Sequence, residues 1–241
     1  MEKELIKHNL PKHISVIMDG NGRWAKKQGA ARVFGHKSAI KAVRDVVEGC
    51  AELEISYLSL YAFSTENWGR PKLEVDALMQ LLVSTIKSEM KTLQDNDVRL
   101  SAIGAIESLP AKCYRELQLA IDETKDNKGL NLILALNYSG KWDILQATKA
   151  LMKELKDQKI DLQSLDYEHI EQYLSTKGVP DPELLIRTSG EFRISNFMLW
   201  QMAYTEIFIT DVLWPDFRKE HLQEALQNYA KRERRFGKVL S

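Results

Sequence analysis

The segment that most constrains the fold is LNLILALN, which spans Leu130–Asn137 and is apolar at nearly every position. A strand with one face in solvent alternates apolar and polar residues, so a continuous apolar run predicts a strand buried on both faces. Such strands are typical of parallel sheets covered by other layers. The segment therefore predicts an α/β fold with further apolar strands beside it.

Strand-like and helix-like segments alternate along the rest of the chain, as such a fold requires. Further predicted strands are about His13–Asp19, Tyr57–Phe63, Val98–Ile103, Leu184–Arg187 and Glu206–Val212. Predicted helices, where apolar residues recur every three or four positions, are about His36–Leu53, Leu73–Gln94, Ala111–Lys125, Lys141–Gln158 and Phe217–Arg234. We expect a single domain over residues 1–241 with a core of about 13–237, built as a mostly parallel six-stranded sheet flanked by helices.

The amino-acid composition limits which binding partners and which cellular compartment we expect for this protein. Lys+Arg and Asp+Glu both number 34, so no overall positive field favours nucleic acid or acidic lipid. Cys50 and Cys113 have no metal-ligand spacing and predict no disulfide framework. The sequence contains neither a signal peptide pattern nor a run of about 18 apolar residues. We expect a soluble cytoplasmic protein, and contact with a membrane surface stays open.

Polar residues gather where the predicted strands end. In open parallel sheets, ligands bind outside the carboxyl ends of the strands, so these residues are candidates for a site. They are Asp19, Gly20, Asn21, Gly22, Arg23 and Trp24 after the first strand, Ser64, Thr65, Glu66, Asn67, Trp68 and Arg70 after the second, Asn137 and Tyr138 at the fourth, and Arg187, Arg193, Ile194 and Ser195 after the fifth. A few acids among several arginines at one sheet edge predict an active site that binds an anion.

The segment DGNGRW at residues 19–24 has more than one interpretation. Its glycines supply positive-φ positions, so it could be only a tight turn after a buried strand. Gly20, Gly22 and Ala25 also match the dinucleotide fingerprint G-x-G-x-x-[G/A]. That fingerprint expects an acid about 20 residues on, at the end of the next strand, whereas Asp45 falls inside a predicted helix. The dinucleotide match is therefore weak.

A metal–diphosphate site fits the same segment better. A carboxylate beside a diphosphate repels it unless a cation bridges the two. Mg²⁺ is typically held by one or two carboxylates together with substrate phosphates. We therefore predict that Asp19 holds Mg²⁺ while the Gly20–Arg23 backbone and the Arg23 side chain bind a diphosphate.

A second anion site is predicted after the fifth strand. Arg187 and Arg193 flank a Ser-Gly turn, with Ser195 two residues further on. A solvated, salt-bridged loop is the alternative, but arginine forks match phosphate oxygens in bidentate fashion. Arg32 and His36, on the approach to the first long helix, are predicted to add to phosphate binding. Two separate diphosphate sites would imply two diphosphate substrates rather than one nucleotide.

These residues carry a resemblance to a known family. The chain resembles the cis-prenyltransferases, the family of bacterial undecaprenyl diphosphate synthases, from about His13 to Gly237. The segments that carry it are HISVIMDGNGRWAKKQG, RVFGHK, LYAFSTENWGRP, NYSGKWDI, IRTSGEFRISNFMLWQMAYTEIFITDVLWPDF and RERRFG. The resemblance implies a homodimeric, Mg²⁺-dependent enzyme with its own α/β fold, which elongates farnesyl diphosphate with successive isopentenyl diphosphate units in cis.

The resemblance also implies roles for individual residues. Asp19 would be the metal-linked acid at the allylic diphosphate, which the residues Gly20, Asn21, Gly22, Arg23, Arg32 and His36 would bind. Asn67 matches a position proposed to assist proton removal, with Ser64, Glu66, Trp68 and Arg70 in the same loop. The isopentenyl diphosphate site would comprise Arg187, Arg193 and Ser195. Glu206 matches a second metal-associated acid, and Arg235-Phe236-Gly237 an Arg-x-Gly end that reaches an active site across the dimer interface.

A growing prenyl chain also requires an apolar tunnel, predicted between the sheet and the helices at His36–Leu53 and Leu73–Gln94. Its candidate lining residues, each of which could equally be plain core, are Leu78, Leu82, Ile86, Ile133 and Ala135. Three positions depart from the family pattern. Phe192 stands where some relatives have a histidine, which excludes a metal ligand there, and Ser139 and Ala105 replace a common glycine and a common acid.

Other functions stay open at this stage. The product could be shorter or longer than undecaprenyl diphosphate, because sequence spacing does not measure the tunnel. A non-catalytic partner subunit would lack the catalytic acid, so the presence of Asp19 and the arginines argues against that alternative. A dinucleotide-dependent oxidoreductase is the most distant alternative.

Overall fold

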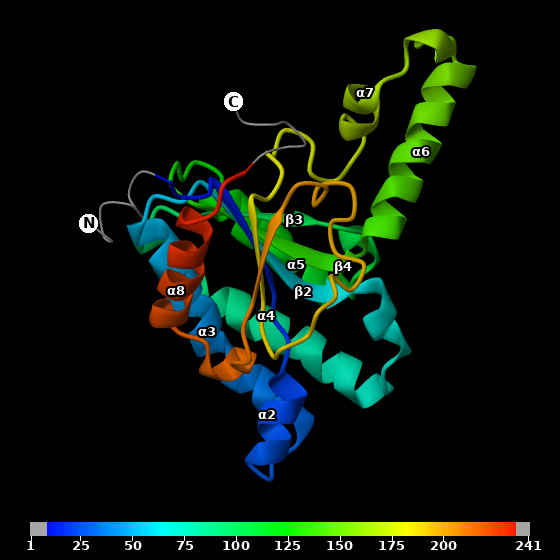
Figure 1. Cartoon of the computed structure of the whole chain (residues 1–241). Helices are drawn as coiled ribbons and strands as arrows, with labels where there is room; N and C mark the ends of the chain where they lie inside the picture. Colours follow the sequence, from blue (N-terminus) through cyan, green and yellow to red (C-terminus); the bar gives the residue numbers. More distant parts are fainter. Residues whose placement is uncertain (1–8, 235–241) are drawn as a thin grey trace.

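Six parallel strands form one sheet, in the order β3-β4-β2-β1-β5-β6, within the computed structural model that describes residues 9–234 (Figure 1). Every pair of neighbouring strands is parallel, so the carboxyl ends of all six strands meet at one edge. The strands are β1 (His13–Ile17), β2 (Tyr57–Ser64), β3 (Arg99–Ile103), β4 (Asn131–Tyr138), β5 (Leu184–Arg187) and β6 (Glu206–Ile209). The predicted α/β class and six-stranded sheet are confirmed.

Six of the seven helices in residues 9–234 lie between strands in the chain, and α8 follows the last strand. The helices are α2 (Asn21–Lys27), α3 (Arg32–Glu52), α4 (Lys72–Asp95), α5 (Ala111–Thr124), α6 (Gly140–Lys156), α7 (Tyr167–Glu171) and α8 (Lys219–Ala230). Short 3₁₀ turns cover Thr65–Gly69, Ile106–Ser108, Leu162–Ser164 and Trp214–Asp216. In Figure 1, α2 lies at the foot of the molecule, and α6 with α7 stands at the opposite end.

The two faces of the sheet are covered differently. Side chains from α3, α4, α5 and α8 pack with one sheet face into the larger apolar cluster. The other face is covered mainly by Phe197 and Met198, from the segment after β5, with Trp142 of α6 packed against them. Alternate residues of β4 therefore belong to different layers, with Leu132 in the larger cluster and Ile133 in the smaller one.

The structure differs from the sequence-based prediction at several element boundaries. The segment after β1 is not only a turn, because Gly20 adopts φ 109° and a seven-residue helix, α2, begins at Asn21. β6 ends at Ile209 and α8 at Ala230, both shorter than predicted. α8 begins at Lys219 because Phe217 and Arg218, which follow the 3₁₀ turn Trp214–Asp216, both have extended backbone conformations.

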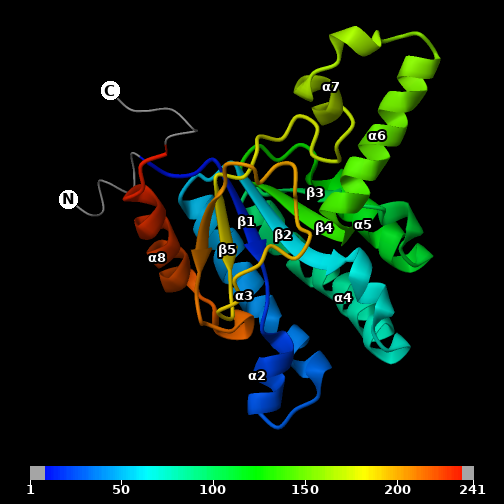
Figure 2. The ribbon, with the colours of Figure 1, turned by 45° about the vertical axis from the view of Figure 1, so that its right-hand side comes forward.

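The strands that carry the predicted site lie side by side. Figure 2 shows β1 between β2 and β5, with α2 directly beyond the end of β1.

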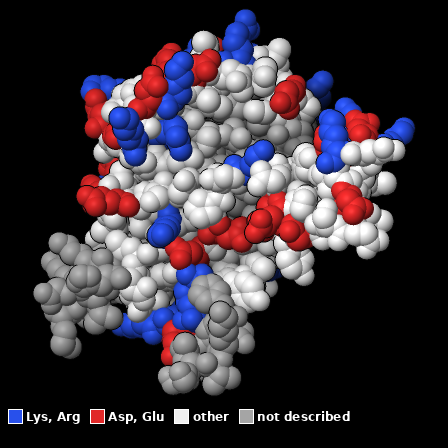
Figure 3. Space-filling view, turned by 90° about the horizontal axis from the view of Figure 1, so that it is seen from above, with Lys and Arg blue, Asp and Glu red and all other residues white. Residues whose placement is uncertain are grey.

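The face seen in Figure 3, at the top of Figure 1, carries acidic and basic side chains next to one another. Within residues 9–234, no helix has both the length and the apolar character that a bilayer-spanning helix needs.

Candidate active site

The first strand delivers Asp19 to the carboxyl edge of the sheet through a backbone that only glycine accommodates. Gly20 has φ 109°, and a Cβ atom there would lie 2.2 Å from Ser189 Oγ. The Asp19 N–H donates to Thr188 Oγ1 at 2.9 Å, and the Thr188 hydroxyl donates back to the Asp19 carbonyl at 2.7 Å. Because Thr188 and Ser189 follow β5, these contacts fix the ends of two neighbouring strands together.

Three arginines surround the Asp19 carboxylate. Its Oδ2 accepts a hydrogen bond from Arg187 Nη2 at 2.9 Å, and its Oδ1 lies 3.3 Å from Arg23 Nη2. Arg193 Nη2 is 3.9 Å from Oδ2. Burial opposes ionisation, but the hydrogen bond and charge of Arg187, with the charge of Arg23, outweigh it and hold the pKa of Asp19 below its ordinary value. Asp19 is therefore a carboxylate at neutral pH.

The segment after β5 places the second group of cationic side chains. Arg187 is 3% exposed, and its Nη1 donates to Ser195 Oγ at 2.7 Å and to the Arg193 carbonyl. Ser195 has φ 50°, which turns the chain back toward β5. Burial lowers the pKa of Arg187 most strongly, and Asp19 opposes that shift. The predicted clustering of Arg187, Arg193 and Ser195 beside Asp19 is what the structure shows, and Ile194 packs instead against the smaller apolar cluster.

Glu191 occupies the space between the two arginine groups. Its Oε1 lies 2.9 Å from Arg23 Nη1, and its Oε2 pairs with Arg193 Nη1. Arg23 and Arg193 therefore share the carboxylate of Glu191. Sequence reasoning did not assign Glu191 a role, although its position between two predicted anion sites was a usable signal. Phe192, the next residue, is 86% exposed.

The loop after β2 contributes mainly amide and indole groups. Asn67 caps the 3₁₀ turn, since its Oδ1 accepts a hydrogen bond from the Ser64 N–H at 3.1 Å. Trp68 Nε1 donates to Asn137 Oδ1 at 2.7 Å, which ties this loop to the end of β4. Glu66 accepts from Asn196 Nδ2 at 2.7 Å, beyond the second arginine group. Thr65 donates to Glu66 and is not among the residues that line the cavity described below.

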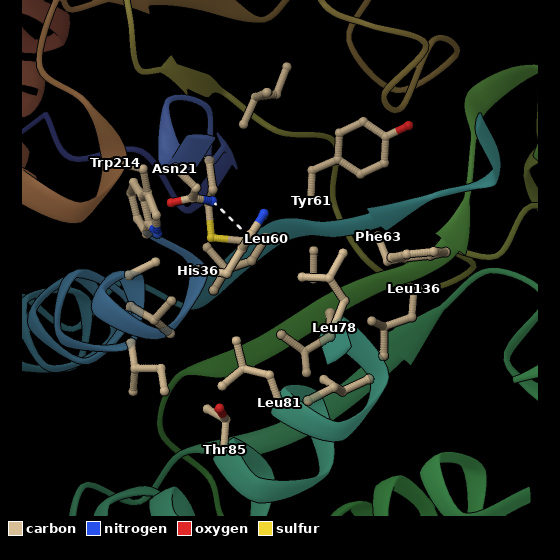
Figure 4. Close-up of a pocket in the computed structure, with 18 of the residues that line it drawn as sticks. Asn21, His36, Leu60, Tyr61, Phe63, Leu78, Leu81, Thr85, Leu136 and Trp214 are labelled. Carbon is tan, nitrogen blue, oxygen red and sulfur yellow. Dashed lines mark hydrogen bonds between the residues drawn. The ribbon is translucent and has the colours of Figure 1, made fainter. Parts of the chain in front are cut away.

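His36 and Asn21 form an uncharged polar pair at the same edge. Asn21 Nδ2 lies 3.3 Å from His36 Nδ1, as Figure 4 shows. Burial first, and then the charges of Arg70 and Arg32, lower the pKa of His36 to about 4, so the imidazole is neutral at pH 7. Asn21 Oδ1 and His36 Nε2 are both buried without a hydrogen-bond partner. Such orphaned atoms in a site are positioned for a ligand.

Arg32 and Arg70 face each other across Glu74. Arg70 Nη1 is 3.2 Å from Glu74 Oε1, and Arg32 Nε is 3.4 Å from the same oxygen. Burial, and then the charge of Arg32, lower the pKa of Arg70. Both cations are therefore only partly neutralised beside His36. Trp24 points elsewhere, because its Nε1 donates to Asp216 at 2.8 Å and its ring stacks on Phe34.

A cavity of about 500 Å³ extends from these polar groups into the larger apolar layer. Figure 4 shows His36, Asn21 and Trp214 on one side of it, and Leu78, Leu81 and Thr85 of α4 lower in the view. Its polar end includes Asp19, Asn21, His36, Asn67, Arg70, Arg187, Arg193 and Ser195. Its apolar walls come from α3, α4 and the sheet, as predicted for a tunnel.

The predicted tunnel lining needs one correction. Leu78, Leu82 and Ile86 of α4 line the cavity, but Ile133 and Ala135 do not. Both belong to the smaller cluster on the opposite face of the sheet. Successive strand residues point to opposite faces, so the β4 residues that reach the cavity are Leu132, Leu134 and Leu136.

Glu206 does not join Asp19 within one chain. It begins β6 and pairs in register with Leu184, the first residue of β5, so it lies at the amino edge of the sheet. Three residue steps, about 10 Å, separate this level from Arg187. Arg232 Nη1 contacts its carboxylate at 2.7 Å. Within one chain Glu206 and Asp19 therefore lie at opposite edges of the sheet, and the metal association of Glu206 stays a prediction. The predicted Arg235-Phe236-Gly237 end lies outside the described residues.

A metal ion at Asp19 would depend on ligands from a substrate. Residues 9–234 contain no group of three or more His, Cys, Asp or Glu side chains placed to hold one. A single carboxylate at the mouth of a cavity that is rich in arginine is compatible with Mg²⁺ bound jointly with phosphate oxygens. The donor set therefore fits Mg²⁺ only in the company of a diphosphate.

A sheet edge rich in arginine that opens into an apolar cavity is typical of a binding site for a molecule with an anionic head and an apolar tail. The family model described as putative undecaprenyl diphosphate synthase matches residues 17–237. The chain belongs to this prenyltransferase family.

Individual relatives agree with that assignment. An isoprenyl transferase of Clostridium tetani is 49% identical over 231 residues, which cover 96% of this chain and 91% of the relative. A ditrans,polycis-undecaprenyl-diphosphate synthase ((2E,6E)-farnesyl-diphosphate specific) of Pasteurella multocida is 47% identical over 234 residues, 97% of this chain and 98% of the relative. The structure of lavandulyl diphosphate synthase from Lavandula x intermedia, in complex with dimethylallyl diphosphate, superposes with a TM-score of 0.92 and 35% identity, covering 95% of this chain and 99% of that one.

Proposed function

We propose that this protein acts in the cytoplasm, where it elongates farnesyl diphosphate by sequential Mg²⁺-dependent condensation with isopentenyl diphosphate. The product would be undecaprenyl diphosphate, from which the lipid carrier of peptidoglycan precursors is made. The observation that carries the proposal is the continuity between the Asp19–arginine cluster and the 500 Å³ apolar cavity. A charged head binds at one end while an apolar chain occupies the other. The farnesyl specificity of the Pasteurella multocida relative supports the choice of substrate.

The two arginine groups divide the two diphosphates between them. Arg23, with the first turn of α2, Asn21 and His36, would bind the allylic diphosphate. Arg187, Arg193 and Ser195 would bind isopentenyl diphosphate. Both substrates displace Glu191 from Arg23 and Arg193, because the carboxylate and the phosphates compete for the same guanidinium groups. Holding both substrates at neighbouring strand ends converts a bimolecular reaction into an oriented one.

The chemistry follows from where charge develops. The allylic C–O bond breaks, the isopentenyl double bond forms the new C–C bond, and a proton leaves the carbon next to the resulting cation. Arg23 stabilises the charge that grows on the departing diphosphate. Mg²⁺ held by Asp19 would supply further charge stabilisation at that diphosphate. Asn67 is a poor base, so its role would be to position a water molecule or the released diphosphate for proton removal.

Substitution of Asp19 tests the proposal. Asp19→Ala is expected to reduce isopentenyl incorporation into farnesyl diphosphate with Mg²⁺ by about 10³-fold or more, since it removes preorganised charge at the reacting group. Asp45→Ala is the matched control, because Asp45 lies on α3 and contacts Arg218 at 3.7 Å, away from the cavity. Full activity of Asp19→Ala, or wild-type protein that makes no polymer, would refute the proposed function. Sizing the products separates undecaprenyl diphosphate from shorter or longer ones.

We also propose that the active protein is a homodimer in which Glu206 acts at the partner's site. One support is that Glu206 and Asp19 lie at opposite sheet edges within one chain. The other is that Arg235-Phe236-Gly237 resembles the Arg-x-Gly end which, in this family, reaches an active site across the dimer interface. Mixing Asp19→Ala with Glu206→Ala protomers tests this, because a mixed dimer would contain one intact site. Recovery of about a quarter of the activity is expected, and no recovery after verified subunit exchange would contradict the proposal.

We further propose that the protein contacts a membrane surface when it releases its product. Co-sedimentation of the protein with lipid vesicles measures this contact.

A further inference from the structure

An ion pair bridges the two helices that wall the apolar cavity. Arg44 of α3 donates to Glu89 of α4 through two hydrogen bonds, Nη2 to Oε1 at 2.6 Å and Nε to Oε2 at 2.9 Å. This fork-to-fork geometry is the most directional form of the arginine–carboxylate interaction. The Glu89 side chain is 13% exposed and that of Arg44 is 46% exposed, so the pair lies at the outer margin of the slot between the helices.

The pair lies far from the diphosphate end of the cavity. Arg44 is eight residues beyond His36 on α3, which is about 12 Å along the helix axis. Glu89 is 15 residues beyond Glu74 on α4, which is about 22 Å. Both line the cavity. Among the described lining residues, they are the charged ones that lie away from the Asp19 end.

Chain growth brings an apolar tail to this pair. Each condensation lengthens the tail by five carbons while the diphosphate stays at the sheet edge. A cavity of about 500 Å³ is of the size that encloses a drug-sized ligand, smaller than a long polyprenyl chain. Continued growth must therefore widen the slot between α3 and α4. An alkenyl chain offers no hydrogen bonds to Arg44 or Glu89, so separating them leaves partly buried charges without their partners.

We infer that the Arg44–Glu89 pair is a latch across the far end of the tunnel that limits product length. The inference rests on the proposed function. It assigns both residues to specificity and neither to the reaction itself. Loss of the latch lowers the resistance to separating α3 and α4, so products are longer while the rate of early condensations is unchanged.

Product sizing after substitution tests the latch. Arg44→Met, Glu89→Ala and the milder Glu89→Gln are expected to shift the main product by at least one isoprene unit toward greater length. Initial isopentenyl incorporation should stay within about twofold of wild type. The charge-swapped variant Arg44→Glu/Glu89→Arg is expected to return the product toward the wild-type length, since the ion pair is restored with reversed polarity.

Glu116→Ala is the matched control. Lys87 of α4 pairs with Glu116 of α5 at 3.0 Å, also at the surface, but neither residue lines the cavity. Its products should have the wild-type length. Unchanged lengths in folded Arg44→Met and Glu89→Gln, or equal lengthening in Glu116→Ala, would overturn the latch while wild-type polymer formation still supports the proposed function. Wild-type protein that makes no polymer would instead overturn both.

Discussion

The buried histidine at the start of β1 makes stability depend on pH in a way that a single substitution isolates. His13 is fully buried, with Nδ1 2.6 Å from the Pro180 carbonyl and Nε2 2.7 Å from Ser59 Oγ. A carbonyl only accepts, so Nδ1 carries the proton and Nε2 accepts from the Ser59 hydroxyl. Burial lowers the pKa of His13 from 6.5 to about 4, against smaller opposing effects of Pro180 and Glu183.

Protonation of His13 is linked to unfolding, because the pKa of this side chain differs between the folded and unfolded states. Between pH 6.5 and 4 the unfolded chain binds a proton at His13 that the folded protein does not, so stability falls as the pH falls. His13 therefore contributes its full stabilisation above pH 6.5 and loses it toward pH 4. For pKa values of 6.5 and about 4, the free energy of unfolding drops by about 2 kcal/mol between pH 8 and pH 5.

Urea unfolding of wild type and His13→Gln at pH 8 and pH 5 measures this contribution. The wild-type free energy of unfolding should fall by about 2 kcal/mol more than that of the variant. His36, whose pKa is also about 4, is present in both proteins and cancels in the difference. Ser59→Ala is the control, since it lowers stability at both pH values but leaves the titrating imidazole in place. Equal falls in wild type and His13→Gln would refute the assignment of a neutral, buried His13.

Two further predictions concern the active site. Gly20→Ala combines a strained φ of 109° with a Cβ 2.2 Å from Ser189 Oγ, so it should cost about 1–3 kcal/mol in thermal unfolding and most of the activity. Gly29→Ala, at φ 65° with open space around it, should cost only the backbone strain and keep activity, and an equal loss of activity in both would contradict the packing argument. Glu191→Gln removes the carboxylate that competes for Arg23, so calorimetry should find inorganic pyrophosphate bound several-fold more tightly. Unchanged or weaker affinity would show that Glu191 does not compete with the anion.

The strands and the polar strand ends could be predicted from the sequence because both are local patterns. The continuous apolar run of β4 identified a buried strand, but the same continuity concealed which residues face which layer. The apolar run makes Ile133 and Ala135 candidates for the tunnel as well as for the core, whereas Leu134 and Leu136 line the cavity. In a strand that alternates apolar and polar residues, the sequence itself shows which residues face the core, and β4 has no such alternation.

Other features depended on contacts between distant segments. The α2 helix was missed because glycines at positions 20 and 22 favour a turn locally. Gly35, where a Cβ would lie 2.0 Å from the Asn21 carbonyl oxygen, shows that close packing of α3 against α2 fixes this segment. The position of Glu206 at the opposite sheet edge likewise follows from the register of β5 and β6, which no local pattern encodes. The role of Glu191 depends on the spatial meeting of two loops.

The cavity has two ends that can change independently in evolution, a polar end at the sheet edge and an apolar end between α3, α4 and the sheet. The groups proposed to bind charge lie at the carboxyl ends of β1, β2 and β5 and in the first turns of α2 and α3, while the far walls of the cavity belong to the later turns of α3, to α4 and to one sheet face. Substitutions in the later turns of α3 and in α4 would reshape the space for the tail without changing Asp19 or the arginines that contact it. A family built on this scaffold can therefore diversify the length of its products while keeping one reaction, because most far-wall positions are not positions that contact Asp19.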